Sequence, residues 1–300
     1  MKIAISGGTG MVGRKFSKLL LSEGHEVIVL TRGDSHQTGG IQYVQWLKEN
    51  SNPEPHLENL DAFVNLAGVS LNDGRWTKQQ KQRIYNSRMQ TTDEILRIFH
   101  ALQSKPLAFL NASAVGIYPI SESAIYTEQS PEKAQDFLGT VVQHWENRAQ
   151  LAHQLGIRTC FTRFGVILAK DEGALPLMVL PYKLGVGGTI GSGRQWLSWI
   201  HVDDVSKALL FVIKQQQLSG PINFTTPNVK RMKEFGKTIG AALHRPHWFP
   251  VPSAVLKLAL GEKSILVLEG QHVLPEKLVN AGFEYQFASL RDAIRDLYDE

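Results

Sequence analysis

The start of the chain places a short apolar segment directly before a glycine-rich turn. Residues 2–6 read KIAIS, a pattern typical of a buried strand, and the turn has glycines at three-residue spacing: Gly7, Gly10 and Gly13. The next residues have the periodicity of a helix, with apolar side chains on one face: Val12, Phe16, Leu19 and Leu20. A strand, a glycine turn and a helix in this order predict a phosphate-binding site, because the helix N-terminus has free N–H groups.

The three glycines have different expected roles in such a site. Gly7 permits the tight turn, Gly10 lets the backbone approach a pyrophosphate, and Gly13 lets the helix pack closely on the strand. We therefore predict dinucleotide binding by the turn and the start of the helix: Gly7, Thr9, Gly10, Met11, Val12 and Gly13. The alternative, a glycine-rich turn without a ligand, leaves the three-residue spacing unexplained.

Length and composition are those of a soluble α/β enzyme. The 300 residues suit a large domain and a smaller one, and 43% hydrophobic and 20% charged residues are ordinary globular values. The net charge of +4 comes from scattered Lys and Arg, so we expect no nucleic-acid partner. The single cysteine, Cys160, excludes an internal disulfide, and no apolar run reaches membrane-spanning length. The first residues read as a core strand and not as a signal peptide, so we expect a cytoplasmic protein without a membrane partner.

Strand-like and helix-like segments alternate over about the first two hundred residues. Further strands are expected at residues 26–30, 41–46, 61–66, 107–111 and 157–163, and long helices at residues 77–103 and 131–155. Strands separated by helices predict an α/β fold with a doubly wound parallel sheet, the NAD(P)-binding Rossmann fold.

The pattern changes after residue 172, where loops rich in Pro and Gly replace the alternation. A helix at residues 203–216 and a strand at residues 222–225 then resume it. We expect a Rossmann domain of residues 1–225, with a cap insertion near residues 172–200. A smaller α+β domain of residues 226–300 is expected to cover the substrate.

The end of the second strand bears on the choice of cofactor. An Asp or Glu at this point would bind the ribose hydroxyls of NAD, but the chain has Arg32 there. A planar guanidinium suits a 2′-phosphate, and Arg14 could add a second positive charge. We therefore favour NADP over NAD. The alternative is a solvated Arg32, with Asp34 binding the ribose.

Three motifs follow along the chain. Residues 65–68 read NLAG, residues 113–118 read SAVGIY, and residues 198–204 read SWIHVDD. The first two lie at carboxyl ends of strands, where an open α/β sheet binds its ligands. Three residues therefore join the predicted cofactor site: Leu66, Ala67 and Gly68.

Together with the glycine turn, these motifs resemble those of the extended short-chain dehydrogenase/reductase superfamily, which includes nucleotide-sugar epimerases and dehydratases. The resemblance covers about residues 1–225 and implies NAD(P)-dependent chemistry. In that superfamily a Tyr-x-x-x-Lys pair lies at the start of the long helix after the fifth strand. The phenol exchanges a proton with the substrate, and the lysine lowers the pKa of the phenol and holds the nicotinamide ribose.

This chain departs from the superfamily at that pair. If Glu146 matches the acid that usually comes later in this helix, Leu138 and Val142 occupy the Tyr and Lys positions. No tyrosine of the chain has a lysine four residues further on, so the pair is absent and not displaced. Leucine and valine cannot transfer protons.

The chain is also similar to an atypical branch of the superfamily, the short-chain dehydrogenase 39U-like epimerase-family proteins. The similarity includes the segments at residues 75–77, 87–88, 113–118 and 194–201. The tail resembles the branch's C-terminal domain of unknown function, at residues 244–246, 261–262, 269–271 and 282–283. The branch implies NADP-type binding and a suspected oxidoreductase or epimerase activity, with no known substrate.

The remaining candidates for catalysis are Ser113 and Tyr118. The Tyr118 phenol is expected at the carboxyl edge of the sheet, unless it packs under the cofactor ring. Ser113 could bind a substrate carbonyl or the ring carboxamide, although a serine at a strand end often only caps a turn. Glu128 and His201 are possible acid–base groups, but His201 directly precedes a helix for which Asp203 resembles an N-cap, which favours a structural role.

The candidate substrate residues are three arginines and one histidine: Arg75, Arg88, Arg194 and His201. Together the arginines could clamp an anionic small molecule, whereas each alone is typical of a surface or an ion pair. The hypothesis requires Arg88, Arg194 and Tyr118 to face one cavity. No metal site is expected.

Two functions stay open at this point. One is an NADP-dependent oxidoreductase or epimerase with a non-standard proton donor, acting on a small or nucleotide-linked carbonyl or alcohol. The other is an NADP-binding redox sensor or assembly partner without turnover. The sequence defines neither the stereochemistry nor the oligomeric state.

Overall fold

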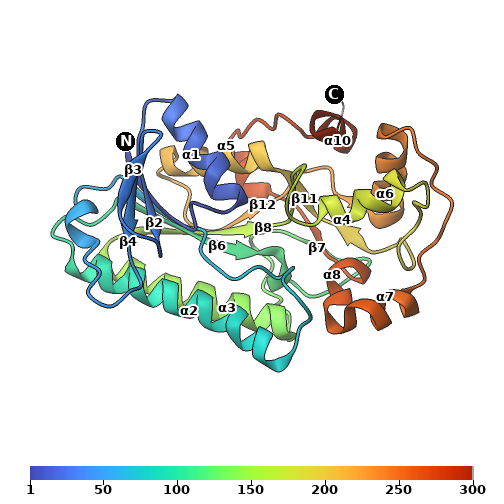
Figure 1. Ribbon diagram of the computed structural model, residues 1–300, viewed down its shortest axis with the longest axis horizontal. Helices are drawn as coiled ribbons and strands as arrows, with labels where there is room; N and C mark the ends of the chain where they lie inside the picture. Colours follow the sequence, from blue (N-terminus) through green and yellow to red (C-terminus); the bar gives the residue numbers. More distant parts are fainter. Residues whose placement is uncertain (299–300) are drawn as a thin grey trace.

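An eight-stranded sheet forms the centre of the protein in the computed structural model, which describes residues 1–298 (Figure 1). The strand order is β12-β8-β6-β5-β1-β2-β4-β3, and only β3 runs antiparallel to its neighbour. The strands are β1 (Lys2–Ser6), β2 (Glu26–Thr31), β3 (His36–Thr38), β4 (Ile41–Gln45), β5 (Ala62–Asn65), β6 (Ala108–Ala114), β8 (Arg158–Phe164) and β12 (Gly220–Phe224). The predicted α/β fold with a doubly wound parallel sheet is confirmed.

Helices cover both faces of the sheet. The helices α1 (Met11–Ser22) and α5 (Val202–Lys214) pack together on one face, and α2 (Lys78–Ala101) and α3 (Phe137–Ala149) on the other (Figure 1). Successive side chains of β1 point to opposite faces of the sheet. Ile3 and Ile5 pack in the apolar cluster that contains residues of α1, whereas Ala4 packs in the one that contains residues of α2. Burial on both faces explains why these strands are apolar throughout.

The predicted start of α3 at Pro131 is wrong. The helix begins at Phe137, because the Asp136 carboxylate accepts a hydrogen bond from the Gly139 N–H and caps it. Its end also differs, since residues 150–155 form a 3₁₀ helix that Gly156 terminates with a φ of 75°. By contrast, α2 starts within one residue of the predicted start, directly after Thr77, whose side chain caps it.

The cap combines the insertion with the C-terminal segment. The helices are α4 (Leu175–Lys183), α6 (Met232–Ala242), α7 (Ser253–Leu260), α8 (Ile265–Leu268), α9 (Glu276–Asn280) and α10 (Leu290–Tyr298). One apolar cluster contains Val179 of α4, Phe235 of α6 and Ile294 of α10, so the insertion and the tail share a core. Three two-stranded pairs complete the cap and its junction with the sheet: β10 (Trp196–Leu197) with β13 (Lys230–Arg231), β9 (Val166–Leu168) with β11 (Trp199–His201), and β7 (Ile125–Tyr126) with β14 (His272–Val273).

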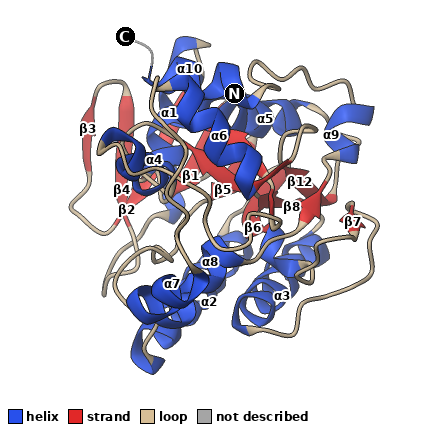
Figure 2. Ribbon diagram, turned by 90° about the vertical axis from the view of Figure 1, so that its right-hand side faces the viewer, coloured by secondary structure: helices blue, strands red, loops and turns tan. Residues whose placement is uncertain are grey.

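The segment around α7 lies beside the start of α2 (Figure 2). An ion pair between Lys81 and Glu262 and a hydrogen bond from Lys263 to the Asn72 carbonyl join the two elements. The cap is thereby tied to the loop that follows β5. No helix within residues 1–298 has both the length and the apolar character that a membrane span requires.

Candidate functional site

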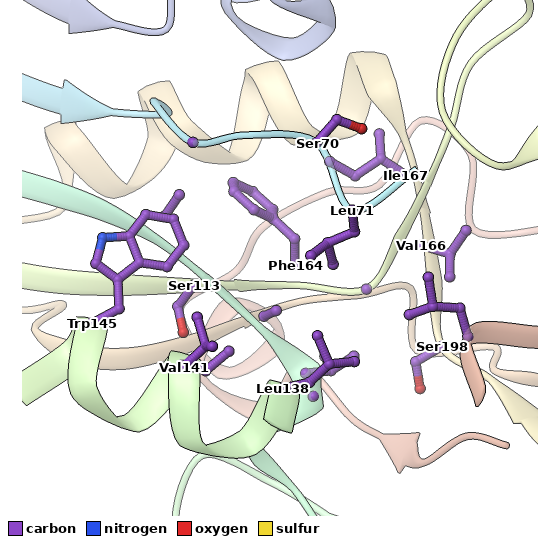
Figure 3. A pocket seen from close by; sticks show the side chains of 18 of the residues that line it. Ser70, Leu71, Ser113, Leu138, Val141, Trp145, Phe164, Val166, Ile167 and Ser198 are labelled. Atoms are coloured by element: carbon purple, nitrogen blue, oxygen red, sulfur yellow. The ribbon is translucent and has the colours of Figure 1, made fainter. Parts of the chain in front are cut away.

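A cavity of about 470 Å³ opens at the carboxyl edge of the sheet, where the strand order reverses between β1 and β5. Its lining begins at the glycine turn after β1, continues along the loop after β5 and the end of β6, and reaches α3 and the cap. Leu138, Val141 and Trp145 of α3 project toward it, with Ser113 beside them (Figure 3). Doubly wound sheets bind their ligands at this reversal of strand order.

The glycine turn has the shape of a phosphate cradle. Gly7 has a φ of +72°, and a Cβ atom on it would lie 2.6 Å from the Leu66 backbone. A Cβ atom on Gly13 would lie 2.5 Å from the Gly7 oxygen. A Cβ atom on Gly10 would meet only that oxygen, at 3.4 Å, so Gly10 faces the cavity. The fold therefore requires Gly7 and Gly13, whereas Gly10 leaves room for a ligand.

The start of α1 offers backbone donors to that ligand. Gly10 is the N-cap and provides no capping side chain, and the first turn contains no acidic residue. The N–H groups of a first helical turn have no partner within the helix, so here they are available to an anion. Met11, Val12 and Gly13 line the cavity, whereas Thr9 does not. The Thr9 carbonyl instead accepts a hydrogen bond from Arg14.

The two arginines predicted near the adenosine differ in whether their guanidinium groups already have partners. Arg14 forms an ion pair with Glu172. Arg32 follows the end of β2 on the surface, and no hydrogen bond or ion pair engages its guanidinium within residues 1–298. Asp34, the alternative ribose ligand, is exposed and contacts Gln45 and Lys48. The guanidinium of Arg32 is thus free for a 2′-phosphate.

A ladder of buried polar side chains shapes the loop after β5. The Ser6 hydroxyl donates to Asn65 Oδ1 at 2.7 Å, and Asn65 Nδ2 donates to Asn111 Oδ1 at 2.7 Å. The Ala67 N–H also donates to Asn65 Oδ1, at 3.2 Å. These bonds join the ends of β1, β5 and β6. They hold the loop against the cavity, which three predicted cofactor residues line: Leu66, Ala67 and Gly68.

At the far end of the cavity, α3 presents only apolar side chains where the superfamily has its Tyr-Lys pair. Leu138 and Val142 both line the cavity. Ser113 also lines it, and its hydroxyl donates to Glu146 Oε1 at 2.6 Å. Because its hydrogen points to Glu146, the Ser113 oxygen has lone pairs available to a ligand in the cavity.

Glu146 belongs to a buried network beneath the cavity. Its carboxylate accepts two hydrogen bonds of 2.7 Å from Arg163, whose Nη1 donates to the Tyr118 oxygen at 2.7 Å. The Tyr118 hydroxyl lies 2.9 Å from both the Asn223 side-chain oxygen and a backbone carbonyl. Burial raises the pKa of Tyr118. The carboxylate, the guanidinium and the phenol satisfy one another with very little exposure to solvent.

The predicted position of Tyr118 at the site is wrong. Its side chain is fully buried and is not among the residues that line the cavity. It stacks on Tyr126 with ring centroids 5.2 Å apart. Glu128 lies outside the cavity too, with its carboxylate accepting the Asn223 N–H at 3.0 Å. Burial raises the pKa of Glu128.

The three candidate substrate arginines do not converge, so the anionic clamp is not formed. Arg194 is 71% exposed and pairs with Glu122 at 3.3 Å. Arg75 is exposed and donates to the Ala259 carbonyl at 3.2 Å. Among the described residues that line the cavity, Arg88 is the one basic side chain.

His201 has a structural role, and it, not Asp203, is the N-cap of α5. Its Nδ1 accepts the Asp203 N–H at 3.2 Å, so the proton of the neutral ring lies on Nε2, which is 3.4 Å from Asp296. The three residues are close enough to resemble a metal site. Because Nδ1 is engaged and Nε2 is protonated, the neutral ring has no lone pair for a metal ion.

Sequence reasoning missed the cap residues that close the cavity, among them Leu266, Gly270 and Gln271. Gly270 and Gln271 lie in the 269–271 segment that resembles the branch's C-terminal domain, but that resemblance does not place them at the cavity, which they reach through tertiary packing. The Ser198 hydroxyl helps to hold them, since it donates to the Gln271 carbonyl at 2.7 Å and accepts the Val273 N–H at 3.0 Å.

Known proteins match the chain along nearly its whole length. Residues 3–223 match the NAD dependent epimerase/dehydratase family, and residues 251–297 match a domain of unknown function, DUF1731. Epimerase family protein YfhF of Bacillus subtilis is 45% identical over 298 residues, which cover 99% of this chain and 98% of that protein.

Two solved structures are similar as well. Human epimerase family protein SDR39U1 (isoform 2), solved with NADPH, is 33% identical and has a TM-score of 0.90, with 99% of each chain covered. A nucleoside-diphosphate sugar epimerase from Corynebacterium glutamicum is 29% identical with a TM-score of 0.79, and 98% of this chain matches 57% of that one. The chain therefore belongs to the NAD dependent epimerase/dehydratase family, as an atypical short-chain dehydrogenase/reductase that carries a DUF1731 domain.

Proposed function

We propose that the protein is an NADP-dependent oxidoreductase or epimerase that acts on a small, uncharged carbonyl or alcohol. One observation carries the proposal: a single cavity joins the glycine cradle to an apolar chamber beneath the cap. The cradle suits a diphosphate, and the chamber suits the reacting end of the cofactor with a substrate above it. A bound nicotinamide supplies or accepts a hydride at that end.

The preference for NADP rests on Arg32. Its exposed guanidinium has no competing partner among residues 1–298 and follows the strand whose end approaches the adenosine ribose in this fold. The NADPH in the structure of human SDR39U1, a relative at 33% identity, supports the same choice. Gly10 and the first turn of α1 would hold the diphosphate.

Ser113 is the proposed contact to the reacting group. Its position beside α3 and the hydrogen bond to Glu146 fix the direction of its lone pairs. It would accept a hydrogen bond from a substrate hydroxyl, or from the carboxamide of the nicotinamide. The Arg163 guanidinium donates two hydrogen bonds to the Glu146 carboxylate and fixes its position, and Glu146 in turn holds the Ser113 hydroxyl.

The lining of the chamber favours an uncharged, largely apolar substrate over a nucleotide sugar. Val115, Ile120, Leu138 and Leu266 contribute aliphatic surface. Asp136 is already engaged as the cap of α3, and the exposed Arg194 does not reach the chamber. A sugar would place several of its hydroxyl groups against these aliphatic walls, although Ser70, Glu269 and Gln271 also line the cavity.

The test combines nucleotide titration with a turnover panel. We expect NADPH to bind more tightly than NADH. We also expect NADPH oxidation with small apolar aldehydes or ketones, in which the hydride adds to the carbonyl carbon and water protonates the oxygen, but not with UDP-glucose or UDP-galactose. Ser113→Ala should lower kcat by about two orders of magnitude and leave the Kd of NADPH within about twofold. Turnover of the UDP-sugars at a rate comparable to the aldehydes would refute the substrate class.

The apolar Leu138 and Val142 favour a second function, because no tyrosine or lysine is among the described residues that line the cavity. In that case the protein binds NADP without turnover, as a redox sensor or assembly partner. NADPH binding without oxidation of any member of the panel would support this alternative.

A further inference from the structure

Arg88 is a cation without a counter-ion at the wall of the cavity. It comes from α2, and no carboxylate pairs with it among the described residues. Its Nη1 donates to the carbonyls of Ile84, at 3.0 Å, and Val69, at 3.2 Å. The guanidinium also lies over the Trp145 ring, 5.0 Å from its centroid. These contacts fix its position, but they do not neutralise its charge.

The remaining donors of the guanidinium are unused. Neither Nε nor Nη2 makes a hydrogen bond within residues 1–298, although a guanidinium has five N–H donors. Burial lowers the pKa of Arg88 to about 10, so the side chain is still charged at neutral pH. Arg88 is half-buried at the cavity wall, so an anion or a hydroxyl group that meets its open donors would stabilise it.

The position of Arg88 indicates which part of a ligand it meets. Its guanidinium carbon lies 3.2 Å from the place that a Cβ atom on Gly68 would take. The neighbouring residues Leu66 and Ala67 pack against Gly7 of the phosphate cradle. Arg88 is therefore on the α3 side of the cradle, whereas Arg32 follows β2 on the opposite side of the strand reversal.

Among the described residues, the wall that α3 forms on that side has no positive charge. The residues of α3 that face the cavity there are Leu138, Val141, Val142 and Trp145. Any cation for the ribose and phosphate next to the nicotinamide must then come from α2. This step rests on the cofactor binding proposed above.

We propose that Arg88 binds the nicotinamide-side phosphate and ribose of the dinucleotide, and is not a substrate anchor. The contact is common to NADP and NAD, because it lies away from the 2′-phosphate. Arg88 and Arg32 consequently contact different halves of the cofactor. Arg88 holds the nicotinamide half, and Arg32 discriminates between NADP and NAD at the adenosine half.

The experiment compares two variants with three probes. Arg88→Met keeps the length of the side chain against Trp145 but removes the charge, and Arg32→Ala is the matched control. Calorimetry with the full-length protein measures the Kd of NADPH, NADH and adenosine 2′,5′-bisphosphate, which lacks the nicotinamide half. Thermal unfolding of each variant and a second substitution, Arg88→Gln, separate a loss of binding from a loss of folding.

Arg88→Met and Arg88→Gln should weaken NADPH and NADH by the same factor, on the order of tenfold to a hundredfold, and leave the bisphosphate within about twofold. Arg32→Ala should weaken NADPH and the bisphosphate but not NADH. The proposal is overturned if folded Arg88 variants bind both dinucleotides normally, or if they lose the bisphosphate as well. A wild-type protein that binds neither dinucleotide would instead overturn the proposed function together with this inference.

Discussion

Glu146→Gln should destabilise the protein by about 3–5 kcal/mol, because it removes one charge of a fully formed buried pair. The side chains of Arg163 and Glu146 are only 3% and 9% exposed, and both carboxylate oxygens accept guanidinium donors at 2.7 Å. Glutamine has nearly the same shape but turns an amide N–H group toward the guanidinium. Arg163 would then be a buried cation without a counter-ion, with only the amide oxygen and the Tyr118 hydroxyl as acceptors.

The control is an ion pair of the same chemistry on the surface. Arg194 and Glu122 are 71% and 51% exposed with a separation of 3.3 Å, so Glu122→Gln should cost less than about 1 kcal/mol. Urea titration of the wild type and both variants gives the free energy of unfolding, with unchanged m-values as the condition for comparison. If Glu146→Gln costs as little as Glu122→Gln, the buried network is not a stability element and the reasoning fails.

Three further predictions concern the turn, the phenol and the buried histidine. Gly13→Ala should cost about 1–3 kcal/mol in urea titration because its Cβ meets backbone at 2.5 Å, whereas Gly10→Ala should keep the stability but weaken NADPH in calorimetry. Tyr118→Phe should cost about 1–3 kcal/mol by leaving an Arg163 donor unpaired, with the Kd of NADPH unchanged. Burial lowers the pKa of His201, although the carboxylates of Asp203, Asp296 and Asp204 act in the opposite direction. As the pH falls, the imidazole is therefore protonated in the unfolded protein before it is protonated in the folded one. Stability should therefore fall as the pH drops below about 6.5, and urea titrations across this range should show a shallower fall for His201→Asn, which keeps a capping side chain.

The sequence predicts the sheet well because burial on both faces makes its strands visible as apolar runs. It also predicts the glycine turn, since close backbone contacts at Gly7 and Gly13 admit no other residue. Helix starts are harder to predict. Pro131 suits a first helical turn, but the Asp136 cap determines where α3 begins, and both signals lie within a few residues.

The site is less predictable than the fold for a different reason. A 3₁₀ turn at Val115–Ile117 follows β6, and it carries Tyr118 away from the sheet edge into the protein interior. Motif spacing does not reveal such a turn. The sequence likewise does not reveal that Arg194 pairs with Glu122, because the two residues are 72 positions apart in the chain. Without knowledge of that pairing, Arg194 is a candidate substrate residue.

The absence of the Tyr-Lys pair coincides with a consistent rearrangement of polar groups. The cavity side of α3 is apolar, and the charges of Glu146 and Arg163 are one layer deeper, where they neutralise each other. Ser113 connects the two layers, because it lines the cavity and bonds to the deeper carboxylate. The positive charge of Arg163 is already paired with Glu146 below the cavity, so it is not available to a phenol inside the cavity. Among the described residues, no tyrosine or lysine lines the chamber, so the hydride exchange proposed above would depend on orientation by the Ser113 hydroxyl and not on a phenol.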